Sequence, residues 1–424
     1  MLDRRKFLLG AATLPMVATM AAGRAVGAPN DALGSGFTLD ETMRSELMQD
    51  AKAAWSYFER AGGAHLGMAA PNIWPEGNKF GSYDIVTMWD TGSIVLATIS
   101  AHALKLIDDK TFDRRIGGIK SFLQKATYRH GANRLPNFRT RVDSGVPVEG
   151  GYDATDTGRL YVALHVLKAY SGGEHDLMKT ASDWKVAATV IGGKLHDIKN
   201  GGIGPAQSNI YRYYVSRGYG FSGVAHDPVY KGADPTSSVE ARAAFLAELA
   251  AIGPISTEPS LLEQVEVGAS PFSQVIAEEL GRAQERRHAE TGRLTCVSEG
   301  PIEVEPWFTY QGYDLARATG EWAWTVYPSV TDKRWATNEF AERFRMVNTK
   351  AAFLWFAAAP SGYTHALWTH VRQKARARQF GFHPGVYEAS GRVPTNIDGN
   401  TNAVVLQAIA YALGGQKPLA QLQA

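Results

Sequence analysis

The 424-residue chain carries 44 Lys and Arg residues against 42 Asp and Glu, a formal net charge of +2, and a single cysteine, Cys296. A nearly neutral chain gives no indication of a nucleic-acid partner, and one cysteine cannot form an intramolecular disulfide. Aromatic residues make up 10% of the chain and include ten tryptophans, a composition that suits contact with flat sugar rings as well as a packed core.

The first 28 residues are typical of an export signal. Arg4 and Arg5 precede a weakly apolar run that ends in small residues at Ala28. This pattern predicts a twin-arginine signal cleaved after Ala28, with a buried N-terminal helix as the alternative. No later stretch reaches the roughly 20 apolar residues that a membrane span needs. We therefore expect the twin-arginine machinery to export a soluble, periplasmic or secreted product with one domain over residues 29–424.

One pattern recurs four times along the mature chain. Each copy begins with Asp or Asn, continues with Thr, and runs on through about ten largely apolar residues: "DTGSIVLATISA" from Asp90, "DTGRLYVALHVL" from Asp156, "NTKAAFLWFAAA" from Asn348 and "NTNAVVLQAIAY" from Asn400. Asp and Asn are favoured N-caps because their side-chain oxygens accept from the first free backbone N–H groups. Segments that are apolar nearly all round are typical of helices buried on every side.

The spacing of these segments predicts a closed ring. Asp90 and Asp156 are 66 residues apart, and the 192 residues from Asp156 to Asn348 leave room for three similar steps. We therefore expect two further buried helices, near residues 217–227 and 285–310. Residues 41–61, 237–252 and 270–292 have the one-sided apolar stripe of outer helices, and residues 209–217 are the best candidate strand. The sequence predicts an all-α fold, an (α/α)6 toroid of six helical hairpins with irregular loops on the active-site rim.

In such a ring the inner helices are parallel, so their N-termini and their dipoles meet at one rim. The loops that enter the repeated helices are rich in acids, aromatic residues and glycine. They bring candidate carboxylates at Asp90, Asp156, Glu299, Glu303 and Glu388. Asp90 and Asp156 could serve only as N-caps. However, the equivalent positions hold asparagine, which shows that capping alone does not require an acid.

Paired carboxylates beside aromatic rings are what hydrolysis of a glycosidic bond needs. We predict Asp90 and Glu299 as the acid and base, with Asp156 as a second base or a sugar-binding group. The best candidates for stacking on sugar rings are Trp74, Trp89, Trp307 and Tyr310. Hydrogen bonds to sugar hydroxyls are expected from Asn400, with Asn396 and Asn402, and from Glu303 and Glu388. There is no HExxH motif, no GxSxG motif and no phosphate-binding glycine loop, so no metal or cofactor is expected.

The chain also resembles a known group of proteins. The motifs that carry the resemblance are "WDTGS", "DTGRLYVAL", "TGRLTCVSEGPIEVEPWFTYQ", "NTKAAFLW", "GVYEASG" and "NTNAVVLQAIAYALGG". They are similar to an uncharacterised bacterial family grouped with the six-hairpin glycosidases and, more distantly, to endo-β-1,2-glucanases. The resemblance covers about Glu41 to Gly415 and implies the toroid and a role on polysaccharide. It places the family signature on Asp90, Asp156, Glu299, Glu303, Glu388 and Asn400, while Gly300 replaces an acid of the common "SEDP" pattern.

The sequence therefore favours an exported glycoside hydrolase that cleaves a bacterial polysaccharide, for example a β-glucan. Two alternatives remain. A polysaccharide lyase on the same toroid would use Tyr213 or His226 with the basic loop of residues 129–141 against a uronate. A non-catalytic glycan-binding factor of an export system would not need the carboxylates.

Overall fold

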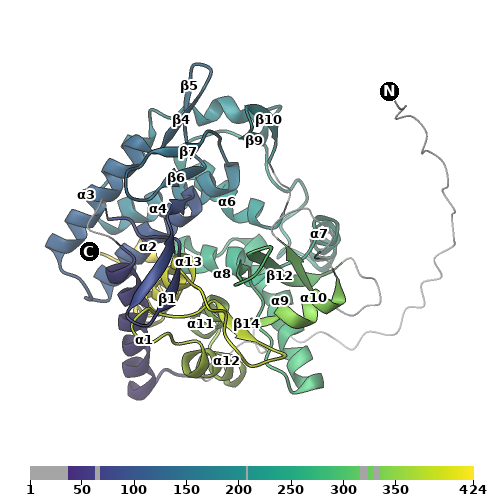
Figure 1. Ribbon diagram of the computed structural model, residues 1–424. Coiled ribbons are helices and arrows are strands. Elements are labelled where there is room, and N and C mark those ends of the chain that lie inside the picture. Colours follow the sequence, from purple (N-terminus) through teal and green to yellow (C-terminus); the bar gives the residue numbers. More distant parts are fainter. Residues whose placement is uncertain (1–36, 63–66, 207–208, 316–322, 329–334, 336) are drawn as a thin grey trace, which may run out of the picture.

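The computed structural model describes residues 37–62, 67–206, 209–315, 323–328, 335 and 337–424. The predicted signal, residues 1–28, lies outside these described residues. Six helices form a closed ring in which each packs on the next and the last packs on the first. In ring order they are α2 (Met88–Ala103), α4 (Ala154–Tyr170), α6 (Tyr211–Ser222), α8 (Thr257–Val267), α11 (Thr349–Ala358) and α13 (Gly399–Leu413). Figure 1 looks along the axis of this ring.

The longer of the remaining helices lie outside the ring (Figure 1), whereas the 3-10 turn Leu419–Gln421 packs against the inner helices α4, α8 and α13. The longer ones are α1 (Glu41–Arg60), α3 (Asp109–Lys125), α7 (Val239–Ile252), α9 (Pro271–Thr291) and α12 (Gly362–Lys374), and the shorter ones are α5 (Met178–Ala181), α10 (Asn338–Phe344) and the 3-10 turns Val186–Thr189 and Leu419–Gln421. The predicted all-α toroid is confirmed, and so are the outer helices expected at 41–61, 237–252 and 270–292.

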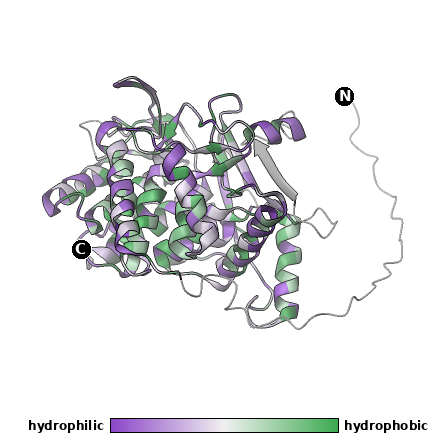
Figure 2. Ribbon diagram, turned by 90° about the horizontal axis from the view of Figure 1, so that it is seen from below, coloured by the Kyte–Doolittle hydropathy of each residue, from purple (hydrophilic) through white to green (hydrophobic). Residues whose placement is uncertain are grey.

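Inner and outer helices differ in how much of their surface they bury. In α13, thirteen of fifteen residues are buried, whereas α1 buries eight of twenty along one face. A helix that is apolar all round must be covered on all sides, and the ring provides that cover. Figure 2 shows the molecule turned by 90° from Figure 1, with many hydrophobic residues on the helices in its middle.

Two glycines allow α4 and α6 to approach closely. A Cβ atom at Gly158 would lie 2.6 Å from the Cβ of Val215, and one at Gly218 would collide with the carbonyl oxygen of Gly158. Only hydrogen fits at these two positions, so the backbones of the two helices are in direct contact.

Short strands lie mostly in the loops between helices, and in the described residues no sheet has more than three strands. Figure 2 shows them gathered largely on one side of the ring. The three-stranded sheets are β16–β1–β2, β10–β9–β8, β11–β12–β13 and β3–β6–β7, and the two-stranded ones are β14–β15 and β4–β5. Their bounds are β1 (Asn72–Glu76), β2 (Lys79–Tyr83), β3 (Ile85–Val86), β4 (Thr127–His130), β5 (Asn133–Pro136), β6 (Arg139–Arg141), β7 (Pro147–Glu149), β8 (Val190–Ile191), β9 (Lys194–Lys199), β10 (Gly202–Pro205), β11 (Gly300–Pro301), β12 (Phe308–Asp314), β13 (Ala323–Pro328), β14 (Met346–Asn348), β15 (Gly385–Tyr387) and β16 (Ile397–Asp398).

Two sequence-based expectations about elements were wrong, the strand at 209–217 and the inner helix near 285–310. The candidate strand at 209–217 is the first half of helix α6, the inner helix expected near 217–227, which begins six residues earlier than 217. No inner helix begins within 285–310, where the last turns of α9 are followed by a loop and by the strands β11 and β12. The sixth inner helix is α8, at 257–267. Within the part of the chain that is described, no helix combines the length and the apolarity needed to cross a membrane.

Candidate active site

A cavity of about 900 Å³ opens where the inner helices begin. Its wall includes the first residues of α2, α4, α6, α11 and α13, and the loop before β11 contributes Glu299. The sixth inner helix lies directly behind this wall, since Glu258 near the start of α8 contacts the lining residues Lys350 and Asn400. The cavity is therefore built by all six inner helix N-termini, as a ring of parallel inner helices requires.

Most of the sequence-predicted site residues line this one cavity. They are Trp74, Trp89, Asp90, Asp156, Glu299, Trp307, Tyr310 and Asn400. Asp90 and Asn400 are 310 positions apart in the sequence, and only closure of the ring brings them together. Carboxyl groups that sequence reasoning missed also line it: Asp153, Asp197 and Asp398.

The helix caps differ from those expected. Asn348 caps α11, as predicted, and accepts from the backbone N–H of Ala351. The other three helices that carry the repeated pattern, α2, α4 and α13, begin earlier than predicted, at caps Thr87, Asp153 and Asp398. Asp90 and Asp156 therefore lie in the third helical position and Asn400 in the second, so the expectation that these three cap their helices was wrong. Position within the first turn leaves their side chains able to face the cavity.

Asp90 is held at the start of α2 by a reciprocal pair of hydrogen bonds. Its Oδ2 accepts from the backbone N–H of Thr87 at 2.9 Å, while its own N–H donates to the Thr87 hydroxyl oxygen at 3.3 Å. Burial raises the pKa of Asp90 to about 6, against the hydrogen bonds from Thr87, and nearby Asp398 raises it further. Desolvation therefore prevails over the helix start, and Asp90 changes charge near neutral pH.

Glu299 has a still higher proton affinity. Its side chain is buried, and burial together with the neighbouring Glu258 raises its pKa to about 8. Lys350 and a hydrogen bond from Tyr211 act in the opposite direction but do not cancel the effect of burial. At pH 7 Glu299 is therefore mostly protonated and Asp90 mostly ionised.

Asp156 lies in the first turn of α4, the next inner helix of the ring after α2. Burial raises its pKa well above the usual range, and the negative charges of Asp153, Asp90 and Glu299 add to that effect. Asp398 is also buried and raised in pKa, with Lys350 opposing the shift. Its Oδ1 accepts from the backbone of Thr401 at 2.7 Å, whereas its buried Oδ2 has no hydrogen-bond partner among the described residues.

A buried ion pair supports this crowded set of acids. Lys350, at the second position of α11, pairs with Glu258, and both side chains are essentially inaccessible to solvent. Glu258 also accepts from Nδ2 of Asn400 at 2.8 Å, and Oδ1 of Asn400 accepts from the Ser93 hydroxyl at 2.7 Å. This network links α2, α8, α11 and α13 beneath the cavity. In the sequence, the only indication of this network is a lysine, Lys350, within the otherwise apolar segment "NTKAAFLWFAAA".

The aromatic residues of the cavity occupy different depths. Trp89 is only 9% exposed and packs edge-on against Tyr211, so most of its ring belongs to the core. Trp307 is 58% exposed and has a φ of +68°, a left-handed conformation that is uncommon for a bulky residue. Trp307 therefore presents its ring to solvent at the edge of the cavity, whereas Trp89 closes its floor.

Several other predicted residues lie elsewhere. Glu303 accepts a hydrogen bond from the Tyr387 hydroxyl, and Glu388 is bound by Arg287 at 2.6 Å and by Arg345 at 3.5 Å. Neither lines the cavity. The fully buried Asn396 and Asn402 bind other protein groups, Asn72 and the backbone of Phe382. Of the residues considered for a lyase, Tyr213 and His226 lie outside the cavity, and the 129–141 loop reaches it only through Phe138 and Arg139.

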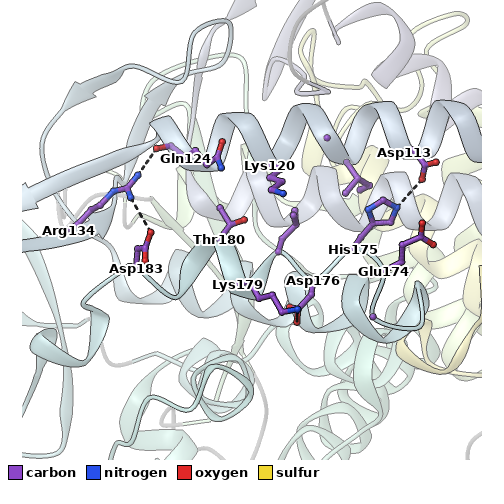
Figure 3. A pocket seen from close by; sticks show the side chains of 14 residues that line it. Asp113, Lys120, Gln124, Arg134, Glu174, His175, Asp176, Lys179, Thr180 and Asp183 are labelled. Carbon is purple, nitrogen blue, oxygen red and sulfur yellow. Dashed lines mark hydrogen bonds and ion pairs between the residues drawn. The ribbon is translucent and has the colours of Figure 1, made fainter.

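A second cavity, of about 760 Å³, lies between α3 and the segment around α5 (Figure 3). Two contacts join charged groups across it, His175 to Asp113 at 2.9 Å and Arg134 to Asp183 at 3.8 Å. We call it the α3–α5 groove. Among the described residues of the chain, no group of three or more His, Cys, Asp or Glu side chains is arranged to hold a metal ion.

Comparisons with known proteins agree with this architecture. The family model described as "Protein of unknown function (DUF3131)" matches residues 49–415. No curated protein matches the chain. Among solved structures, a candidate glucoamylase from Bacteroides caccae is 12% identical with a TM-score of 0.58, covering 89% of this chain and 95% of that one.

Two endo-β-1,2-glucanases are also similar in structure. The enzyme from Chitinophaga pinensis, in complex with sophorotriose and glucose, is 13% identical with a TM-score of 0.56, covering 89% of this chain and 94% of that one. A mutant of the enzyme from Talaromyces funiculosus, in complex with β-1,2-glucan, is 12% identical with a TM-score of 0.56, covering 88% and 85%. At these identities the likeness shows the fold, and the predicted resemblance to six-hairpin glycosidases is confirmed.

Proposed function

The chain belongs to this family of unknown function, and we propose that it hydrolyses glycosidic bonds of a polysaccharide, with a β-glucan as the first candidate substrate. The observation that carries the proposal is the pair of carboxyl groups in one cavity whose pKa values are about 8 for Glu299 and about 6 for Asp90. Between these values one group holds a proton and the other can accept one. Acid–base cleavage of a glycosidic bond requires that combination.

In the proposed reaction Glu299 donates its proton to the glycosidic oxygen as the bond from that oxygen to the anomeric carbon breaks. Asp90 accepts a proton from the water whose oxygen attacks the same carbon. The products are two neutral sugar chains, an ionised Glu299 and a protonated Asp90, and exchange with solvent restores the starting state. A single displacement of this kind inverts the configuration at the anomeric carbon.

Asp156 and the aromatic residues have binding roles in this proposal. Burial and three neighbouring acids raise the pKa of Asp156. Its carboxyl group therefore keeps its proton to a higher pH than a solvated aspartate does, and the protonated group can donate a hydrogen bond to a sugar hydroxyl. The exposed ring of Trp307 offers a face for stacking on a sugar.

The charges of the cavity favour a neutral substrate. Each cation in its wall already has a carboxylate partner: Lys350 pairs with Glu258, Lys199 with Asp153 and Asp197, and Arg139 with Glu149. A uronate would therefore meet an excess of acids and no unpaired cation among the described lining residues. This favours hydrolysis of a neutral glucan over the lyase alternative. The β-1,2-glucanases of the same fold, one with sophorotriose bound, support a β-glucan.

The test is to incubate the chain from residue 29 onward with β-1,2-, β-1,3- and β-1,4-glucans and with polyuronates, following reducing ends and ultraviolet absorbance together. Hydrolysis predicts new reducing ends from a neutral glucan without absorbance, whereas unsaturated products of a lyase would absorb. Binding of a glucan without release of any reducing ends would contradict the proposal and favour the non-catalytic alternative. We also propose export through the twin-arginine signal, which a fractionation of cells expressing an Arg4→Lys/Arg5→Lys variant would test.

A further inference from the structure

One row of residues crosses the small sheet β16–β1–β2 from the interior to the surface. In the register of this sheet Asp398 lies opposite Asn72, and Asn72 lies opposite Tyr83. All three line the cavity. Asp398 is 5% exposed and Tyr83 is 40% exposed, so the row leads from the buried carboxyl groups to solvent. With neighbouring strands roughly 5 Å apart, Tyr83 lies about 10 Å from Asp398 along it.

The same face of the sheet carries a second aromatic ring. Side chains alternate between the faces of a strand, so Trp74 shares the cavity face with Asn72 and Tyr83, while Ile73 points into the core. Trp74 lies opposite Gly81, and a Cβ atom at Gly81 would meet nothing within 4 Å. The space beside the Trp74 ring is therefore open toward the cavity, and Tyr83 is its diagonal neighbour.

Tyr83 is exposed but fixed in position. Nη2 of Arg139 donates to its hydroxyl oxygen at 2.9 Å, and Nη1 of Arg139 donates to Oε2 of Glu149 at 3.0 Å. Arg139 belongs to β6 and Glu149 to β7, so a second sheet holds the ring. A ring held in place before binding loses little conformational freedom when a ligand stacks on it.

We propose that Trp74 and Tyr83 on the β1–β2 hairpin form an outer sugar-binding subsite, which holds the part of a β-glucan chain that extends out of the cavity, and that Arg139 is the positioning residue for Tyr83. The proposal rests on the proposed function and deepens it. An enzyme with such an outer subsite binds long chains better than short ones. Stacking of sugar units on the rings of Trp74 and Tyr83 explains why an aromatic residue is exposed at position 83. The sequence analysis did not single out Tyr83.

The experiment measures binding separately from cleavage. In the Glu299→Gln background, calorimetry gives dissociation constants for β-1,2-glucan and for sophorotriose. Tyr83→Ala removes the outer ring, and Gly81→Leu fills the open space beside Trp74. Each is expected to weaken binding of the long glucan about tenfold, the effect of losing roughly 1.4 kcal/mol of buried apolar contact, with a much smaller change for sophorotriose. Ile203→Ala, an exposed apolar residue of β10 outside the cavity, is the matched control.

Two variants test the positioning role. Tyr83→Phe keeps the ring but loses the bond to Arg139, and Arg139→Met removes the donor. Each should weaken binding of the long glucan by less than Tyr83→Ala and should leave the difference between long and short ligands smaller than in the parent. The melting temperature of each variant, measured alongside, detects a loss of folding.

The outcomes separate this proposal from the proposed function. If folded Tyr83→Ala and Gly81→Leu bind the long glucan as the parent does, or weaken long and short ligands equally, the outer subsite is overturned, although cleavage by the unsubstituted protein would still support a hydrolase. If the unsubstituted protein cleaves no glucan but both variants lose binding of the long chain, the subsite stands and the hydrolase does not. Failure of the Glu299→Gln protein to bind either glucan overturns the subsite.

Discussion

The cavity at the N-termini of the inner helices, which we call the rim cavity, and the α3–α5 groove contain similar side chains in different surroundings. Asp113 and Asp183 of the groove are 58% and 75% exposed at their side chains and face His175 and Arg134. The acids of the rim cavity are buried among other acids, which raises the pKa values of Asp90, Asp156, Glu299 and Asp398. The charged side chains of the groove are solvated, and exposed contacts of this kind contribute little to stability. Burial without a cation for each acid is what makes the rim cavity a candidate for acid–base chemistry.

The same substitution in the two regions gives the sharpest contrast. Glu299→Gln should lower kcat on a cleavable glucan by about 10²- to 10⁴-fold, because the amide has no acidic proton to transfer to the leaving oxygen. Glu174→Gln, a matched change in the groove, should leave kcat unchanged. The measurement is release of reducing ends at pH 7. Equal activities of the two variants would remove Glu299 from the chemistry.

Loss of the buried cation should destabilise the protein far more than loss of an exposed one. Lys350→Met leaves Glu258 buried without its partner and should lower the free energy of unfolding by about 3–5 kcal/mol, whereas Lys120→Met in the groove should change it by less than about 1 kcal/mol. Urea denaturation at pH 7 measures both. The double variant Lys350→Met/Glu258→Gln should recover part of the loss, and no recovery would mean that the ion pair is not the cause.

The pH dependence of kcat should show two limbs. Activity needs Asp90 ionised and Glu299 protonated, so kcat should fall about tenfold per pH unit below about pH 6 and above about pH 8. Steady-state rates from pH 4 to pH 10, with the melting temperature followed over the same range, give the profile. A rate that stays constant from pH 7 to pH 10 would contradict the role of Glu299.

Stability should respond to pH with the sign set by the raised pKa of Glu299. Because the folded protein binds this proton more tightly than the unfolded chain does, the contribution to stability is full below the unfolded value, near 4.5, and is lost as the pH rises through about 8. The change in the free energy of unfolding caused by Glu299→Gln should therefore be more favourable at pH 9 than at pH 5, by more than about 1 kcal/mol. Thermal unfolding at the two pH values measures this, and Glu174→Gln should show no such difference.

The ring and its rim were predictable because apolar segments behind Asp or Asn recur at regular spacing. Helix α8 was not predicted as an inner helix because the acidic residues of its sequence, "TEPSLLEQVEV", are typical of a partly exposed helix. Glu258, Glu263 and Glu266 are nevertheless buried, and their partners Lys350, Arg217 and Arg159 come from α11, α6 and α4. A charged residue that is neutralised by a distant segment cannot be recognised from its own neighbours. Tertiary contacts also explain the wrong prediction of a strand at residues 209–217. The aromatic residues there have strand propensity, but the segment packs as helix α6.

Candidate carboxylates were predictable where they followed the repeated pattern, and the exact caps were not. Thr87, Asp153 and Asp398 precede the pattern by two or three residues, and nothing local distinguishes them from other loop residues. The crowding that raises the pKa values depends on Asp153, Glu258 and Asp398 meeting across the ring, which only the three-dimensional arrangement reveals.

The contact between α13 and α2 joins the last inner helix of the ring to the first. During synthesis Asp90 leaves the ribosome more than 300 residues before Asp398, so the wall that they share cannot exist until α13 has been synthesised. A truncated or stalled chain would keep several stacked hairpins but would have an open groove where the cavity should be. Docking of α13 would therefore be the step that completes the cavity, and a circular permutant that begins within the ring would have to close the ring at another pair of helices to form the same cavity.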